Sequence, residues 1–210
     1  MSKVTSLSFG PAPSPADVDK TVICYGSPRG GTSMVAGAMY GLGIDIGTDL
    51  PVNLEDYQFN MDKNDLTREE FVDSMIAAID ERNKTKGTWG WKYPSANRYL
   101  EDVLTHVRNP HLVLVFRDPI PASIRAGAPH QISTERAILQ RLRAEIKNLR
   151  IAELCGAPAI AVSYEKAAQQ PEVFLEEMAE FLGTGIPPNK DKIVDFMRPG
   201  KYKDPKMMFE

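Results

Sequence analysis

Short apolar runs alternate with amphipathic segments from residue 20 onward, and the two patterns have different periods. Four runs are short, rich in valine, isoleucine, leucine or aromatic residues, and bounded by glycine, proline or acidic residues, which is typical of buried strands. They lie at residues 21–25, 87–94, 111–119 and 158–165. We predict one strand in each run.

Elsewhere, apolar residues recur at spacings of three and four, which predicts helices. These helices lie at residues 31–42, 66–82, 133–154 and 171–183. Thr67 and Glu70 have the spacing of a capping box at the start of the second helix. In the third helix we expect the basic residues to face solvent and four apolar residues to face the core. The four are Ile138, Leu142, Ile146 and Leu149.

Strands that alternate with helices favour a parallel sheet covered by helices on both faces. The predicted fold class is therefore α/β: a three-layer α/β/α domain with a central parallel sheet, over residues 20–210. Residues 1–19 are rich in serine, proline and alanine and have no period. For them we predict a mobile N-terminal arm.

Composition narrows the classes of function. The 210 residues are 42% hydrophobic and 25% charged, with a net charge of −3, as in an ordinary soluble globular protein. This balance argues against a general nucleic-acid or membrane-surface binder. Cys24 and Cys155 are expected to be small buried hydrophobes in a reducing compartment. The three histidines have no metal-ligand spacing and the N-terminus has no signal-peptide pattern, so we expect a cytoplasmic protein without a metal site.

All four predicted strands end in polar or charged residues. The ends carry Gly26-Ser27-Pro28-Arg29, Trp91-Lys92, Arg117-Asp118 and Ser163-Tyr164-Glu165. Ligands of open α/β sheets bind outside the carboxyl ends of the strands. Polar groups at all four ends therefore favour an anion site at that edge of the sheet.

The sequence GSPRGGTS, residues 26–33, joins the first strand to the first helix. Gly30 and Gly31 permit positive φ angles and close approach of the backbone to a ligand. The helix that follows points its N-terminal N–H groups and its dipole at the loop, and Thr32 and Ser33 add hydroxyl donors. This is the layout of a phosphate-binding loop.

The Walker pattern G-x-x-x-x-G-K-[ST] fits this loop only in part. Gly26 and Gly31 match it, but Thr32 occupies the lysine position and no compensating lysine follows. An ATPase or GTPase is therefore disfavoured without being excluded. A simple tight turn is the other alternative; it explains the two adjacent glycines but leaves Arg29, Thr32 and Ser33 unexplained.

The segment SPRGGTSM resembles the 5′-phosphosulfate loop of the sulfotransferases that use 3′-phosphoadenosine 5′-phosphosulfate (PAPS). The family pattern is Pro-[Lys/Arg]-Ser-Gly-Thr-[Ser/Thr]. The matching residues are Pro28, Arg29, Gly31, Thr32 and Ser33, with Gly30 in place of the serine. Four later segments are similar to family segments, in family order: NLEDYQFN, WGWKYP, VFRDPIPASIR and VSYEKAAQQPEVFLEEMAEFLG. The whole resemblance spans residues 20–183.

The resemblance implies a P-loop-like topology and a reaction in which a sulfonyl group passes from PAPS to a hydroxyl or amine. The other product is 3′-phosphoadenosine 5′-phosphate (PAP). Such a transfer needs in-line positioning, neutralisation of the leaving phosphate and a base for the acceptor. The resemblance implies no metal, because the site supplies the cations itself.

The resemblance also implies roles for individual residues. Pro28, Arg29 and the backbone N–H groups of residues 30–33 are expected to hold the 5′-phosphosulfate, Arg29 through its forked guanidinium. Lys92 is expected to neutralise the leaving oxygen or to contact the transferring sulfonate. Arg117 is expected to bind the 3′-phosphate. Arg29 could instead be a surface arginine in a turn, and Lys92 a lysine whose stem is buried. Arg117 could instead be a partner in an ion pair.

The remaining nucleotide contacts match the family less closely. The family usually has a serine eight residues after the arginine at 117; here Arg125 takes that position and Ser123 lies two residues earlier. Either residue is a candidate for the 3′-phosphate. Tyr164 matches a tyrosine that packs beside the adenine, with a plain buried aromatic as the alternative. The tail RPGKYK offers Arg198 and Lys201, which could fold over the 3′-phosphate.

The general base is expected to be Glu55, which falls where the family has a Glu-Asp stretch. A carboxylate beside an apolar wall can have a raised pKa suited to proton abstraction. Asp56 and His130 are alternatives, and Glu55 is equally well explained as a solvated loop acid. Together with Arg29 and Lys92, Glu55 completes the set of expected catalytic residues.

Three functions are thus open: a PAPS-dependent sulfotransferase first, a nucleotide kinase or NTPase with a degenerate phosphate loop second, and a non-catalytic nucleotide-binding or scaffold domain third. The chain is short for a sulfotransferase, so the part that builds the acceptor pocket must be reduced. We expect a small-molecule or glycan acceptor, with neither nucleic acid nor membrane as a partner. No pattern identifies the acceptor or the oligomeric state.

Overall fold

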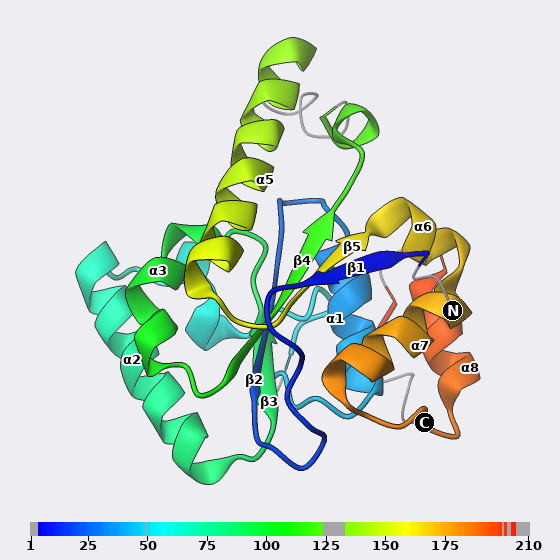
Figure 1. Ribbon diagram of the computed structural model, residues 1–210. Helices are drawn as coiled ribbons and strands as arrows, with labels where there is room; N and C mark the ends of the chain where they lie inside the picture. The colour runs from blue at the N-terminus through cyan, green and yellow to red at the C-terminus, as the bar shows by residue number, and fades with distance from the viewer. Residues whose placement is uncertain (1–3, 49, 124–132, 199, 201–202, 205–210) are drawn as a thin grey trace.

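The computed structural model describes residues 4–48, 50–123, 133–198, 200 and 203–204. Its centre is a five-stranded sheet of order β1-β5-β4-β2-β3 (Figure 1). The strands are β1 (Ser6–Phe9), β2 (Thr21–Tyr25), β3 (Trp89–Lys92), β4 (Pro110–Phe116) and β5 (Ala159–Ser163). The last four are parallel to one another, and β1 pairs with β5 in the antiparallel sense. All four predicted strands are therefore confirmed.

Helices cover both faces of this sheet. On one face lie α1 (Thr32–Gly41), α6 (Tyr164–Gln169), α7 (Pro171–Leu182) and α8 (Lys190–Met197). On the other lie α2 (Arg68–Thr85), α3 (Leu100–Val103) and α5 (Thr134–Cys155). Short 3₁₀ turns occur at η1 (Tyr57–Phe59), η2 (Met61–Lys63), η3 (Ala96–Arg98) and η4 (Leu104–His106). No helix in the described part of the chain is both long enough and apolar enough to cross a membrane.

The core lies on both faces of β2, whose five residues are all buried. Val22 and Cys24 pack into the core beneath α1 and α7, whereas Ile23 and Tyr25 pack into the core beneath α2 and α5. Side chains alternate along a strand, so a strand that is buried throughout must be covered on both sides. The predicted three-layer α/β/α architecture is confirmed.

The start of α2 is the capping box that its sequence predicts. The Thr67 hydroxyl accepts a hydrogen bond from the backbone N–H of Glu70 at 3.3 Å. In return, the Glu70 carboxylate accepts one from the backbone N–H of Thr67 at 2.9 Å. Two N–H groups that lack acceptors within the helix are thereby satisfied.

The predicted mobile arm over residues 1–19 does not hold for residues 6–9, which form β1 at the edge of the sheet. The carboxylate of Glu177, on α7, accepts hydrogen bonds from the N–H of Val4 and from the hydroxyls of Thr5 and Ser6, at 2.6, 2.5 and 2.6 Å. Burial favours a raised pKa for Glu177, but these hydrogen bonds outweigh it and the pKa is lowered. A run as short as SLSF has no strand signal of its own, because it is stabilised by pairing with β5, far along the chain, where Ser6 lies opposite Val162.

Helix α5 turns a different face inward from the one predicted. Its buried residues are Ala137, Arg141, Asn148, Ile151 and Ala152. Leu142, Ile146 and Leu149, expected in the core, are 40%, 55% and 46% exposed. The reason is that the inward face packs partly over the polar loop at residues 26–28. Arg141 and Asn148 donate hydrogen bonds to backbone carbonyls of that loop, and leucine could not donate them.

Candidate functional site

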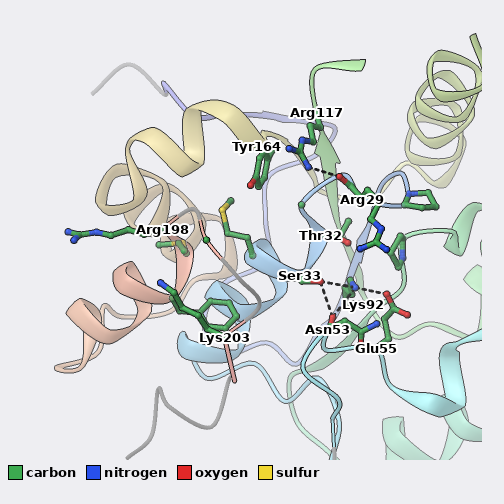
Figure 2. A pocket seen from close by; sticks show the side chains of 17 residues that line it. Arg29, Thr32, Ser33, Asn53, Glu55, Lys92, Arg117, Tyr164, Arg198 and Lys203 are labelled. Carbon is green, nitrogen blue, oxygen red and sulfur yellow. Dashed lines mark hydrogen bonds and ion pairs between the residues drawn. The ribbon is translucent and has the colours of Figure 1, made fainter. Parts of the chain in front are cut away.

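A cavity of ≈ 670 Å³ lies at the carboxyl ends of the parallel strands (Figure 2). Most of the residues predicted from the sequence line it. They are Pro28, Arg29, Gly31, Thr32, Ser33, Glu55, Lys92, Arg117, Tyr164 and Arg198. The edge of the sheet predicted to hold an anion therefore does carry a concave surface with several cations.

The other predicted residues are not placed in this lining. Gly30 was expected to offer its N–H to an anion, but that N–H donates to the Ser27 carbonyl at 2.8 Å within the loop. Ser123 is buried away from the cavity lining, and its hydroxyl has no hydrogen-bond partner among the described residues. Arg125, Lys201 and the alternative base His130 lie outside the described residues.

The glycine-rich loop places a left-handed glycine directly before α1. Gly31 has a φ of 93°, and a Cβ atom there would lie only 2.1 Å from Cδ2 of Tyr164. Only glycine combines this backbone conformation with this approach to an aromatic ring. The N–H groups of the first turn of α1, at Thr32 and Ser33, have no acceptor within the helix and face the cavity end of the loop.

Arg117 ties the end of β4 to this loop. Its guanidinium lies 4.5 Å above the ring of Tyr164 and donates a hydrogen bond from Nη1 to the Arg29 carbonyl at 2.7 Å (Figure 2). Its Nε is 3.7 Å from the Glu165 carboxylate. That Nε is buried and makes no hydrogen bond with the described residues, and the Glu165 carboxylate is the charge that faces it.

Lys92 is 1% exposed and stands at the end of β3 beneath the loop. Its Nζ donates to the Asn53 carbonyl at 2.9 Å, to Glu55 Oε1 at 2.7 Å and to the Ser33 hydroxyl at 3.3 Å. Burial lowers the pKa of Lys92, and the neighbouring Glu55 carboxylate offsets part of that shift. Because all three donors are engaged, an anion that contacts Lys92 must displace one of these partners.

Glu55 lies beside cations and amides instead of the apolar wall expected for a base. Besides Lys92, it accepts a hydrogen bond from Asn60 Nδ2 at 2.9 Å. Asp56, the alternative base, is buried in an ion pair with Arg82 at 2.5 Å and does not line the cavity. Asp56 is therefore engaged in holding the segment before α2, and Glu55 is the carboxylate that reaches the site.

The opposite side of the cavity is built by the end of α8 and has an apolar part that the sequence analysis missed. Phe196 and Met197 line it together with Met34 of α1. Lys203 lines it as well, on the same side as Arg198 (Figure 2). We expected the tail to contribute cations to the site. Where those cations lie, and that Phe196 lies beside them, depends on how α8 packs against α1, which the sequence pattern does not show.

Two residues of α5 also contact the loop, and the sequence analysis missed both. Arg141 donates from Nη1 and Nη2 to the Pro28 carbonyl at 3.4 and 3.2 Å. Asn148 donates from Nδ2 to the Gly26 carbonyl at 2.7 Å. Arg141 and Asn148 are seven residues apart, so they lie on the same face of the helix about two turns apart. This spacing could have indicated a polar contact face, but the helix has many other basic residues from which the pair does not stand out.

A glycine-rich turn between a strand and a helix, bordered by buried and half-buried cations at the carboxyl edge of a parallel sheet, is how P-loop-like nucleotide-binding folds hold phosphate groups. The sheet and the loop therefore define a P-loop-like α/β fold.

Comparison with known proteins agrees with this class at the level of the fold. No protein-family model matches the chain, and no curated protein matches it with significance. Among solved structures, the chain is similar to the sulfotransferase domain of the Synechococcus PCC 7002 olefin synthase, with a TM-score of 0.53 and 18% identity over 91% of this chain and 79% of that one. A sugar kinase from Janibacter sp. HTCC2649 gives a TM-score of 0.49 and 15% identity over 80% and 96%. At 18% identity, the likeness to the sulfotransferase domain concerns the fold alone.

Proposed function

We propose that this protein is a cytoplasmic PAPS-dependent sulfotransferase that acts on a hydroxyl or amine of a small-molecule or glycan acceptor. The observation that carries the proposal is the arrangement of Arg29, Lys92 and Arg117 around one cavity at the end of a glycine-rich loop. Three cations from three strand ends suit a ligand with two separated anionic groups better than a single phosphate.

The residues present fit such a donor. Arg29, Lys92 and Arg117 line the cavity, so the side chains that would pair with the phosphosulfate and with the 3′-phosphate are present at one surface. The approach of Gly31 to Tyr164 leaves no room for a side chain between loop and ring. Met34, Phe196 and Tyr164 offer apolar and aromatic surface of the kind that a nucleobase contacts.

When bound, PAPS would supply the sulfonyl group and a phosphate leaving group. Arg29 and the first-turn N–H groups of α1 hold negative charge at the loop. Lys92 exchanges its bond to Ser33 for a ligand oxygen and so neutralises charge that develops there. Glu55, which lines the cavity, would be the carboxylate that accepts the proton of the acceptor.

The roles assigned to the two ends of the nucleotide predict a selective effect of Arg117→Ala. We expect this variant to lose about 10- to 100-fold in affinity for PAP, because a charged hydrogen bond to the 3′-phosphate is removed. Affinity for adenosine 5′-phosphosulfate, which lacks the 3′-phosphate, should change much less. Isothermal titration calorimetry with both nucleotides measures the difference.

Arg108→Ala is a suitable control, because Arg108 bonds backbone carbonyls remote from the cavity lining. Equal losses for the two nucleotides in Arg117→Ala would remove Arg117 from recognition of the 3′-phosphate. They would instead indicate that Arg117 acts only through its bond to the Arg29 carbonyl.

A further inference from the structure

The carbonyl groups of the phosphate loop are each held by a hydrogen-bond donor. Asn148 donates to the carbonyl of Gly26, Arg141 to that of Pro28 and Arg117 to that of Arg29. The carbonyl of Ser27 accepts the N–H of Gly30. A loop that binds an anion must keep its carbonyl oxygens away from the ligand, and here no carbonyl from 26 to 29 can turn without breaking one of these bonds.

Arg29 is the residue in this loop whose backbone most needs such support. Its φ is 61°, in the left-handed region that a residue with a Cβ atom adopts only at a cost. The conformation of Arg29 is set by the two peptide units that flank it. The oxygens of those units are the Pro28 and Arg29 carbonyls, so the two groups that fix them are Arg141 and Arg117.

We propose that Arg141 is a positioning residue: it holds the backbone of Arg29 in its left-handed conformation and thereby aims the Arg29 side chain into the anion site. Arg141 is itself 7% exposed and is not part of the cavity lining. Glu145, one turn further along α5, lies 4.0 Å from Arg141 Nε and balances the buried charge. Asn97 in turn donates to Asn148 Oδ1 at 2.6 Å, which steadies the second contact from α5.

The test is a double-mutant cycle between Arg141→Met and Arg29→Gly. Methionine keeps the bulk of the stem and removes the donors, while glycine adopts the left-handed conformation without support. We expect Arg141→Met alone to accelerate hydrogen exchange at the Gly30 amide, in the ligand-free protein, by about 10-fold. In the Arg29→Gly background the same substitution should add little, so the two effects are less than additive.

Two further variants separate positioning from a general contribution to folding. Arg143→Met removes an arginine from the exposed face of the same helix and should leave loop exchange unchanged. Arg141→Lys can still donate to one carbonyl and should give an intermediate exchange rate; it also serves if Arg141→Met does not fold. Additive effects in the cycle, or loop exchange that Arg141→Met and Arg141→Lys both leave unchanged, would overturn the proposal.

A second readout rests on the proposed function. Affinity for PAP should fall about 10-fold in Arg141→Met and little further when the change is made in Arg29→Gly. Affinity for adenosine 3′-monophosphate, which lacks the 5′ group that the loop holds, should stay within twofold of the unmutated protein. If the unmutated protein binds no PAP, the proposed function fails, while the exchange experiment on the free protein still decides the role of Arg141.

Discussion

Replacing Lys92 by methionine is expected to reduce the rate at which PAP is released from PAPS by about 10²–10³-fold, the usual effect of losing one preorganised donor at a developing negative charge. The ammonium of Lys92 is the deepest cation of the cavity and bonds Ser33, Asn53 and Glu55 at once. Methionine fills the same volume without a charge. Steady-state assays with PAPS, with water or an identified acceptor as the nucleophile, measure the loss.

The same substitution leaves the half-buried Glu55 carboxylate without its cation, so a loss of stability accompanies the loss of rate. The double variant Lys92→Met, Glu55→Gln removes the unpaired carboxylate and should recover stability, so it shows whether Glu55 is the source of the instability. Lys63→Met, at an exposed lysine of η2, is the matched control. A folded Lys92→Met that releases PAP at the normal rate would remove Lys92 from catalysis.

The second large effect is expected for Gly31→Ala. The added Cβ would meet Tyr164 Cδ2 at 2.1 Å, with backbone at a φ of 93°. A left-handed conformation costs an alanine about 1–2 kcal/mol and overpacking costs a further 1–3 kcal/mol, so we expect the free energy of unfolding to fall by about 2–5 kcal/mol. Because Tyr164 must move, the support under Arg117 is lost and nucleotide affinity should fall as well.

Gly43→Ala is the control for the backbone part of this effect. Gly43 has a φ of 89°, and no atom lies within 4 Å of a Cβ built on it. Chemical denaturation of both variants gives the difference due to the ring contact alone. If Gly31→Ala lost no more stability than Gly43→Ala, the tight fit of loop and ring would be disproved.

Features with a local cause could be predicted from the sequence. The strands at residues 21–25 and 111–116 are apolar enough to require burial on both faces. Thr67 and Glu70 fix the start of α2 through contacts three residues apart. The placement of Arg29, Lys92 and Arg117 at one edge follows from the rule that parallel strands end on the same side.

Features that depend on partners far along the chain could not be predicted. β1 pairs with β5, and Glu177 binds three residues at its start. The inward face of α5 carries Arg141 and Asn148 because it meets carbonyls of residues 26 and 28. Hydrophobic periodicity assigns leucine and isoleucine to the buried face of a helix. It therefore predicts the wrong buried face wherever a helix packs against a polar loop.

The missing Walker lysine also has a structural counterpart. Thr32 occupies the lysine position, while the ammonium of Lys92 reaches the neighbouring Ser33 hydroxyl from another strand. The loop therefore has a cation next to it without carrying a lysine in its own sequence. Arg29, from inside the loop, adds a fork of donors that a lysine does not offer.

Isothermal titration calorimetry of the purified protein with PAP and with ATP distinguishes a sulfotransferase from a kinase or NTPase. The cation pattern predicts that PAP binds without magnesium and at least about 10-fold more tightly than ATP with magnesium, because in the proposed site Arg117 and the loop would each hold one of its two phosphates. Tighter binding of ATP with magnesium would contradict the account in favour of a kinase or NTPase. Binding of neither nucleotide would contradict it in favour of a non-catalytic domain.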